Sequence, residues 1–201
     1  YEDVKSPLMI IERYSKYHEY DSVEVDNELG GYLAVKHLLD CGYRNIAIIT
    51  GKEDYFASQR RLKGAEKALE KNSIPLKKEL VIEGSFSIEG GRKAAKQLFE
   101  SGHTIDAVFC MNDLIALGAL QYCNEHDINV PDEVGVIGYD NISYAELPQI
   151  QLTTIHQPKY ELGKMLFETL LEEIKNKDHS RPTRKIILNP ELKIRKTTRV
   201  K

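Results

Sequence analysis

The chain contains 201 residues, of which 41% are hydrophobic and 29% are charged. This composition is ordinary for a folded protein with a sizeable core, and it excludes collagen-like, coiled-coil and largely disordered chains. The length allows one large domain or one and a fraction. The formal net charge is −3, and only the segment from Arg181 to Lys201 is clearly basic. This balance argues against nucleic-acid binding through this chain.

The absence of targeting signals and the number of cysteines narrow the class of protein further. No apolar run approaches the roughly 20 residues of a transmembrane helix, and no signal segment opens the chain. We therefore expect a cytoplasmic protein that has no membrane partner. The three cysteines, Cys41, Cys110 and Cys123, are widely spaced. Their number and spacing predict buried reduced thiols rather than disulfides or a CxxC metal site.

Short apolar runs alternate with segments of helical periodicity along most of the chain. In chain order the pattern predicts a strand at 7–11, a helix at 27–40, a strand at 45–50, a helix at 56–71, a strand at 80–84, a helix at 88–101, a strand at 105–110, a helix at 112–126 and a strand at 133–138. Nearly continuous apolar strands that alternate with helices predict an α/β fold with a parallel sheet and helices on both faces.

The last quarter of the chain departs from this alternation. A strand is predicted at 151–155 and a helix at 158–175, because Pro158 suits the first turn of a helix. After a polar loop, residues 185–188 and 191–194 mix apolar and polar positions. They predict two half-exposed strands near a sheet edge.

Polar and aromatic residues follow the predicted strands, where an open parallel sheet binds its ligands. The residues at these strand ends are Glu12 and Arg13, Gly51 to Asp54, Gly84 to Phe86, Met111 to Asp113, and Tyr139 to Asn141. Carboxylates, amides, an arginine and aromatic rings suit a polyhydroxylated ligand. Helix capping explains Asn112 about as well as ligand binding does, and Asp113 is assigned chiefly to a helix cap.

Catalytic and metal-binding patterns are missing from the sequence. It contains no Gly-x-Ser-x-Gly elbow, no phosphate-binding loop and no pair of histidines at positions i and i+4. Asp26, Asp113 and Asp140 could be proposed as a carboxylate metal cluster, but they come from different strand ends. We therefore expect no enzyme activity, no metal and no cofactor.

Motifs spread over nearly the whole chain resemble those of one known family. They are Val25 to Tyr32, Gly42 to Ala47, Arg61 to Gly64, Asn112 to Gly118, Val130 to Asp140, Leu152 to Pro158 and Pro190 to Arg195. In this order they resemble the LacI/GalR family of bacterial transcription regulators. The resemblance implies an effector-binding core of two similar α/β subdomains, like a periplasmic sugar-binding protein, with the ligand in the cleft between them.

The resemblance also implies which residues bind the effector. The six residues carried over by motif are Arg61, Phe86 as a stacking aromatic, Asn112, Asp140, Gln157 and, where family members often carry Asp, Glu12. A structural alternative stays open for several of them. Arg61 could be an exposed helix residue, Phe86 a core residue, Asp140 a turn residue and Gln157 a solvated residue of the crossover.

Set against the family, the chain resembles one complete subdomain with part of a second. We expect residues 1–22 to be a remnant strand of the N-terminal subdomain and 23–150 the C-terminal effector-binding subdomain. Residues 151–180 would be a crossover strand and helix, and 181–201 strands that close the subdomains. A start at Tyr1 fits a fragment of a longer regulator, in which a missing helix-turn-helix domain would bind operator DNA.

The leading functional hypothesis is the effector-sensing part of a LacI-type repressor. Its expected partners are a sugar or sugar phosphate and a second copy of the chain, with 117–124 and 142–148 as candidate dimer surfaces. One alternative is a transport-type sugar-binding protein of the same fold. Another is a fragment that binds no ligand and mainly associates with itself.

Overall fold

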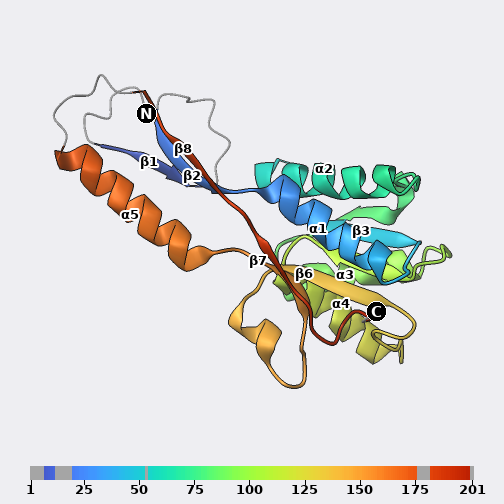
Figure 1. Cartoon of the computed structure of the whole chain (residues 1–201). Helices are drawn as coiled ribbons and strands as arrows, with labels where there is room; N and C mark the ends of the chain where they lie inside the picture. The colour runs from blue at the N-terminus through green and yellow to red at the C-terminus, as the bar shows by residue number, and fades with distance from the viewer. Residues whose placement is uncertain (1–6, 12–19, 53, 176–181, 200–201) are drawn as a thin grey trace. The chain divides into compact units, whose positions relative to one another are not determined.

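The computed structural model describes residues 7–11, 20–52, 54–175 and 182–199, and Figure 1 shows their arrangement. The chain divides into two compact units. Unit 1 comprises Tyr1–Asp26 and Pro158–Pro190, and unit 2 comprises Asn27–Gln157 and Glu191–Lys201. The divisions therefore follow residues 26, 157 and 190, whereas the boundaries expected from the sequence followed residues 22, 150 and 180. Glu12 lies outside the described residues.

Unit 2 is built on a six-stranded sheet in the order β4-β3-β5-β6-β7-β9. Its strands are parallel except for β9, which runs antiparallel to β7 at the edge of the sheet. The strands are β3 (Ile46–Thr50), β4 (Val81–Glu83), β5 (Ala107–Cys110), β6 (Gly135–Asp140), β7 (Thr153–His156) and β9 (Glu191–Lys193). The predicted α/β fold with a parallel sheet is confirmed.

Two pairs of helices cover the two faces of this sheet (Figure 1). They are α1 (Asn27–Asp40) and α2 (Phe56–Lys71) on one face, and α3 (Ile88–Phe99) and α4 (Asp113–Glu125) on the other; short 3₁₀ turns, η1 (Lys78–Leu80) and η2 (Ser143–Glu146), lie between elements. Successive strand residues point to opposite faces. Ile48 accordingly packs in the core under α1 and α2, whereas Ala47 and Ile49 pack in the core under α3 and α4.

Glycines let the two helices of each pair touch along their backbones. A Cβ atom on Gly31 would lie 1.9 Å from the carbonyl oxygen of Arg61, and one on Gly64 would lie 1.9 Å from that of Glu28. Any larger residue at either position would overlap the backbone of the facing helix. The backbone contact at Gly31 therefore fixes the position of Arg61 relative to helix α1.

Unit 1 contains a three-stranded parallel sheet in the order β1-β2-β8, with one long helix packed on β1 and β2. Its elements are β1 (Met9–Ile11), β2 (Asp21–Val25), α5 (Lys159–Lys175) and β8 (Lys185–Leu188). Strand β2 was not predicted from the sequence. Its first residue, Asp21, is buried and accepts hydrogen bonds from the backbone N–H of Arg184 at 2.7 Å and from the Arg184 Nε at 3.4 Å.

Most predicted elements coincide with observed ones to within two residues. The helices predicted at 27–40 and 56–71 have those bounds, and the two late strands lie at sheet edges as expected, β8 in unit 1 and β9 in unit 2. The strand predicted at 133–138 is shifted, because it continues through Tyr139 and Asp140. Asp140 is therefore the last residue of β6 rather than the start of a loop.

Two of the three cysteines match the predicted buried thiols. Cys110 and Cys123 are buried, and burial raises the pKa of the Cys123 thiol to about 11. Cys41 is only partly buried and donates a hydrogen bond to the carbonyl of Arg199 at 2.9 Å, so the prediction was wrong for this cysteine. No helix within the described ranges is long and apolar enough to span a membrane.

Residues 195–199 pack across the edge of unit 2, where they meet a buried histidine. The Thr198 hydroxyl lies 2.8 Å from His37 Nε2 and 3.0 Å from the Thr153 hydroxyl. Burial lowers the pKa of His37, although Asp40 opposes this shift. The folded protein therefore resists protonation of an imidazole that the unfolded chain protonates near its ordinary pKa of about 6.5.

This arrangement predicts a loss of stability in mild acid. Because the unfolded chain binds more protons below about pH 6.5, the free energy of unfolding should fall as the pH is lowered through that value. Replacing His37 by glutamine should make this fall shallower. Urea denaturation between about pH 7.5 and pH 5.5 measures it, with the same substitution at the exposed His103 as the control. If the free energy of unfolding depended on pH equally in His37→Gln and wild type, buried His37 would not be the cause of the loss of stability in acid.

Candidate functional site

Arg61 is the buried centre of the candidate site. Only 5% of the residue is exposed, because helix α2 directs it inward toward the carboxyl edge of the sheet. Its guanidinium stacks 3.6 Å from the centre of the Tyr139 ring. Its Nε donates to Asn27 Oδ1 at 2.8 Å and its Nη1 donates to the carbonyl of Met111 at 2.5 Å. The alternative that Arg61 is an exposed helix residue is therefore excluded.

Two further predicted residues join this arginine. The Nη2 of Arg61 lies 3.8 Å from Oδ1 of Asp140, and Nε2 of Gln157 donates to the same oxygen at 2.6 Å. Asp140 ends β6 and Gln157 directly follows β7, its parallel neighbour, in which His156 is the register partner of Asp140. The carboxyl ends of the two strands thus bring Asp140 and Gln157 together. We call Arg61, Asp140 and Gln157 the Arg61 cluster.

Asp140 has an unusual backbone conformation. Its φ is +109° and that of the following Asn141 is +50°, so two consecutive residues with side chains occupy a region that normally favours glycine. Such conformations cost on the order of 1–3 kcal/mol each and persist where surrounding contacts enforce them. The carboxylate of Asp140 is therefore aimed by the end of the strand and not by a free loop.

Asn112 and Asp113 have different roles in the structure. The Asn112 side chain caps α4 by accepting from the backbone N–H of Ile115 at 2.8 Å, which leaves its Nδ2 without a hydrogen-bond partner among the described residues. Asp113 is fully buried and is not the cap, so its assignment to a helix cap was wrong. Its carboxylate accepts from the Thr154 hydroxyl at 2.5 Å and from the backbone N–H of Ile142 at 2.8 Å.

Phe86 packs between the two cores and against a second aromatic ring. It is partly buried, and its ring meets that of Tyr55 edge to face, with 5.4 Å between the ring centres. A Cβ atom on Gly51 would lie 2.1 Å from the Phe86 ring, so this glycine leaves room for the aromatic. Tyr55 is half exposed. No ring contact or hydrogen bond between described residues ties Phe86 to the Arg61 cluster, so its role in stacking stays a prediction.

Sequence reasoning missed two residues that hold Arg61. Tyr139 lies under the guanidinium and Asn27 accepts from it, yet Tyr139 was only one of the strand-end residues and Asn27 only the first residue of a predicted helix. The signal available for Tyr139 was its place at the carboxyl end of a predicted strand, where ligands of parallel sheets bind. The described residues contain no group of three side chains able to hold a metal ion.

The fold and the Arg61 cluster together belong to a known class of binding domain. The sequence profile of the family described as "Periplasmic binding protein-like domain" matches residues 35–198. Because this match covers most of the chain, the chain belongs to that family.

Particular relatives within this family are bacterial transcription regulators. The chain is 39% identical over 193 residues to the HTH-type transcriptional repressor PurR of Vibrio atlanticus (strain LGP32), covering 96% of this chain and 57% of that protein. The solved transcriptional regulator CelR–cellobiose complex is 29% identical with a TM-score of 0.87, covering 94% of this chain and 58% of that one. A LacI family regulator from Enterococcus faecium with bound ribose is 30% identical with a TM-score of 0.85, covering 96% and 70%.

These comparisons confirm the resemblance to LacI/GalR regulators. The chain spans little more than half the length of the curated PurR repressor that it matches. It corresponds to the effector-binding, periplasmic-binding-protein-like core of such regulators.

Proposed function

We propose that this chain is the effector-sensing part of a LacI-type transcriptional repressor, not an enzyme, and that its effector is a sugar or a related small molecule. The observation that carries the proposal is the Arg61 cluster, which gathers a guanidinium, a carboxylate and an amide at the carboxyl edge of the sheet. Ligands of open α/β sheets bind at this edge. In the cytoplasm of the cell, effector binding would change the conformation of a dimeric repressor and so its hold on operator DNA.

The chemistry of the cluster supports a polyhydroxylated ligand. Asp140 can accept hydrogen bonds from hydroxyl groups, and the Nδ2 of Asn112 can donate to ring or hydroxyl oxygens. The charges of Arg61 and Asp140 balance each other, which favours an uncharged sugar over a sugar phosphate. The cellobiose and ribose named for two similar regulators are ligands of this chemistry.

A thermal-shift screen tests the proposal on the protein as it stands. Uncharged sugars that include D-ribose and cellobiose are compared with sugar phosphates over a range of concentrations. A ligand present at about 100 times its Kd stabilises the folded state by about 2.7 kcal/mol. The expected result is a saturable rise in melting temperature with at least one uncharged sugar. A screen in which no sugar or sugar phosphate shifts the melting temperature overturns the proposal and favours a fragment that only associates with itself.

A further inference from the structure

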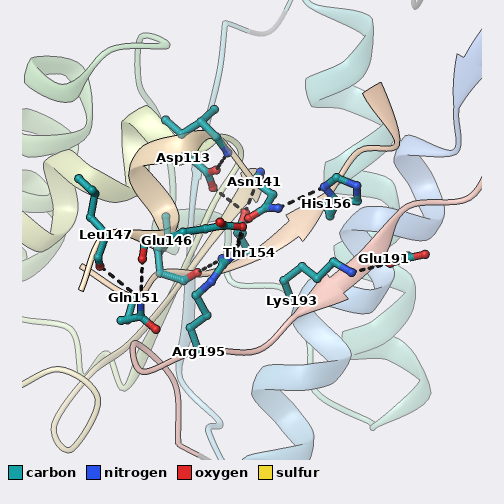
Figure 2. A network of polar contacts seen from close by, with 12 residues as sticks. Asp113, Asn141, Glu146, Leu147, Gln151, Thr154, His156, Glu191, Lys193 and Arg195 are labelled. Atoms are coloured by element: carbon teal, nitrogen blue, oxygen red, sulfur yellow. Dashed lines mark hydrogen bonds and ion pairs between the residues drawn. The ribbon is translucent and has the colours of Figure 1, made fainter. Parts of the chain in front are cut away.

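A second polar network lies next to the Arg61 cluster, and Figure 2 shows it from close by. Its central residue is Asn141, which directly follows Asp140. The Arg195 Nη2 donates to Asn141 Oδ1 at 2.8 Å, and Asn141 Nδ2 lies 3.2 Å from His156 Nδ1. The network therefore joins the segment after β9 to the ends of β6 and β7.

Arg195 is held firmly enough to act as a fixed donor. Only 13% of its side chain is exposed. Its Nη1 donates to the carbonyl of Leu152 at 2.7 Å, its backbone N–H donates to the Thr153 hydroxyl at 3.0 Å, and its Nη2 also pairs with Glu146 at 2.9 Å. The loop between β6 and β7 is thus tied to Arg195 at both its ends.

The donor-only character of arginine fixes the direction of the whole network. A guanidinium has no acceptor, so the Asn141 atom that faces it is the carbonyl oxygen. The amide nitrogen of Asn141 then faces His156, and because this nitrogen is a donor, Nδ1 of the imidazole must accept. The neutral imidazole therefore carries its proton on Nε2.

This network and the Arg61 cluster both join the carboxyl ends of strands β6 and β7. Asn141 pairs with His156 and, one residue away on each strand, Asp140 pairs with Gln157. Both Asp140 and Asn141 have positive φ values, so the backbone alone does not favour this arrangement. Both hydrogen bonds lie at the end of the β6–β7 ladder, where Asp140 and His156 are register partners.

We propose that Asn141 and Arg195 are positioning residues that hold the Asp140 carboxylate and Gln157 in the geometry that binds the effector. They act through two successive hydrogen bonds that run in one direction, from Arg195 to Asn141 and from Asn141 to His156. Asn141 and Arg195 themselves need not touch the ligand. The part of this proposal that concerns the effector rests on the proposed function. The direction of these hydrogen bonds does not rest on it, because it is a property of the ligand-free protein.

The decisive variant is Asn141→Asp, which keeps the size of the side chain and the acceptor for Arg195 but replaces the donor to His156 by an acceptor. In ¹⁵N NMR spectra recorded where the imidazole is neutral, wild type should show His156 protonated on Nε2. In Asn141→Asp the proton should move to Nδ1. The control is Glu146→Gln, which removes the negative charge of another partner of Arg195 and should leave the tautomer unchanged.

Two results overturn the positioning proposal, namely a wild-type His156 protonated on Nδ1 or an Asn141→Asp tautomer equal to wild type. The first decides the case even if the variant does not fold. In a calorimetric titration with D-ribose, or with cellobiose if ribose does not bind, Asn141→Asp and Arg195→Gln should each lose about tenfold in affinity, or about 1.4 kcal/mol. Unchanged affinity in both variants also overturns it. If wild type binds no sugar or sugar phosphate of the thermal-shift screen, sugar sensing is contradicted, while the tautomer of His156 still decides the direction of the hydrogen bonds.

Discussion

Replacing Gly64 by alanine is expected to lower the free energy of unfolding by about 2–3 kcal/mol, because overpacking a tight contact costs about this much. The added Cβ would lie 1.9 Å from the carbonyl oxygen of Glu28 and 2.7 Å from the backbone nitrogen of Tyr32. Both are backbone atoms of α1 and cannot rotate away. The two helices must then separate, and this displaces the segment of α2 that carries Arg61.

Gly163→Ala is the matched control for this prediction. Gly163 lies inside helix α5, and a Cβ atom there would meet nothing within 4 Å. Alanine is favoured over glycine in a helix by about 1 kcal/mol, so Gly163→Ala should stabilise the protein slightly. Urea denaturation followed by circular dichroism measures both variants. A Gly64→Ala protein as stable as Gly163→Ala would show that the two backbones are not in close contact.

Replacing Arg61 by alanine is expected to reduce the affinity for the effector by about 100-fold, which corresponds to about 2.7 kcal/mol. The substitution leaves the Asp140 carboxylate without its cation and the carbonyl of Met111 without its donor. A buried group that loses a charged partner forfeits this order of energy. Asp140→Ala should have a comparable effect, because it removes the acceptor shared by Arg61 and Gln157.

The adjacent Arg60→Ala provides the control for Arg61→Ala. Arg60 is a more exposed arginine on the same helix and pairs with Glu28 instead of Asp140. Calorimetric titration with the sugar that gives the largest thermal shift should return wild-type affinity for Arg60→Ala. In a fusion to the DNA-binding domain of a LacI-type repressor, Arg61→Ala and Asp140→Ala should keep operator binding and lose the response to effector. Wild-type response in both variants would contradict the site.

The regular elements of unit 2 could be predicted from local patterns, whereas β2 of unit 1 could not. Most strands of unit 2 contain short apolar runs, and its helices α1 and α3 are followed by Gly42 and Gly102, whose φ values are +92° and +77°. Strand β2 has the sequence DSVEV, and its burial depends on Arg184, far along the chain, which neutralises Asp21. No local pattern reports a partner at that distance.

The sequence predicted some members of the candidate site but not the contacts between them. Family motifs indicated Arg61, Asp140 and Gln157, and the structure brings these three together. The same reasoning assigned Asp113 to a cap, because an acidic residue at the start of a helix is a common local pattern. Its buried carboxylate instead joins Thr154 to the loop after β6. Contacts of this kind depend on the order of strands in the sheet, which the linear pattern does not contain.

The chain crosses between its two units three times, after Asp26, Gln157 and Pro190, and this has a consequence for its synthesis on the ribosome. Strand β9 pairs with the open edge of β7 only after residues 158–190 of the other unit have been made. Until then the outer backbone groups of β7 lack their strand partner, and such edges invite pairing with other chains. The sheet of unit 2 can therefore be completed only after the second segment of unit 1 has been synthesised.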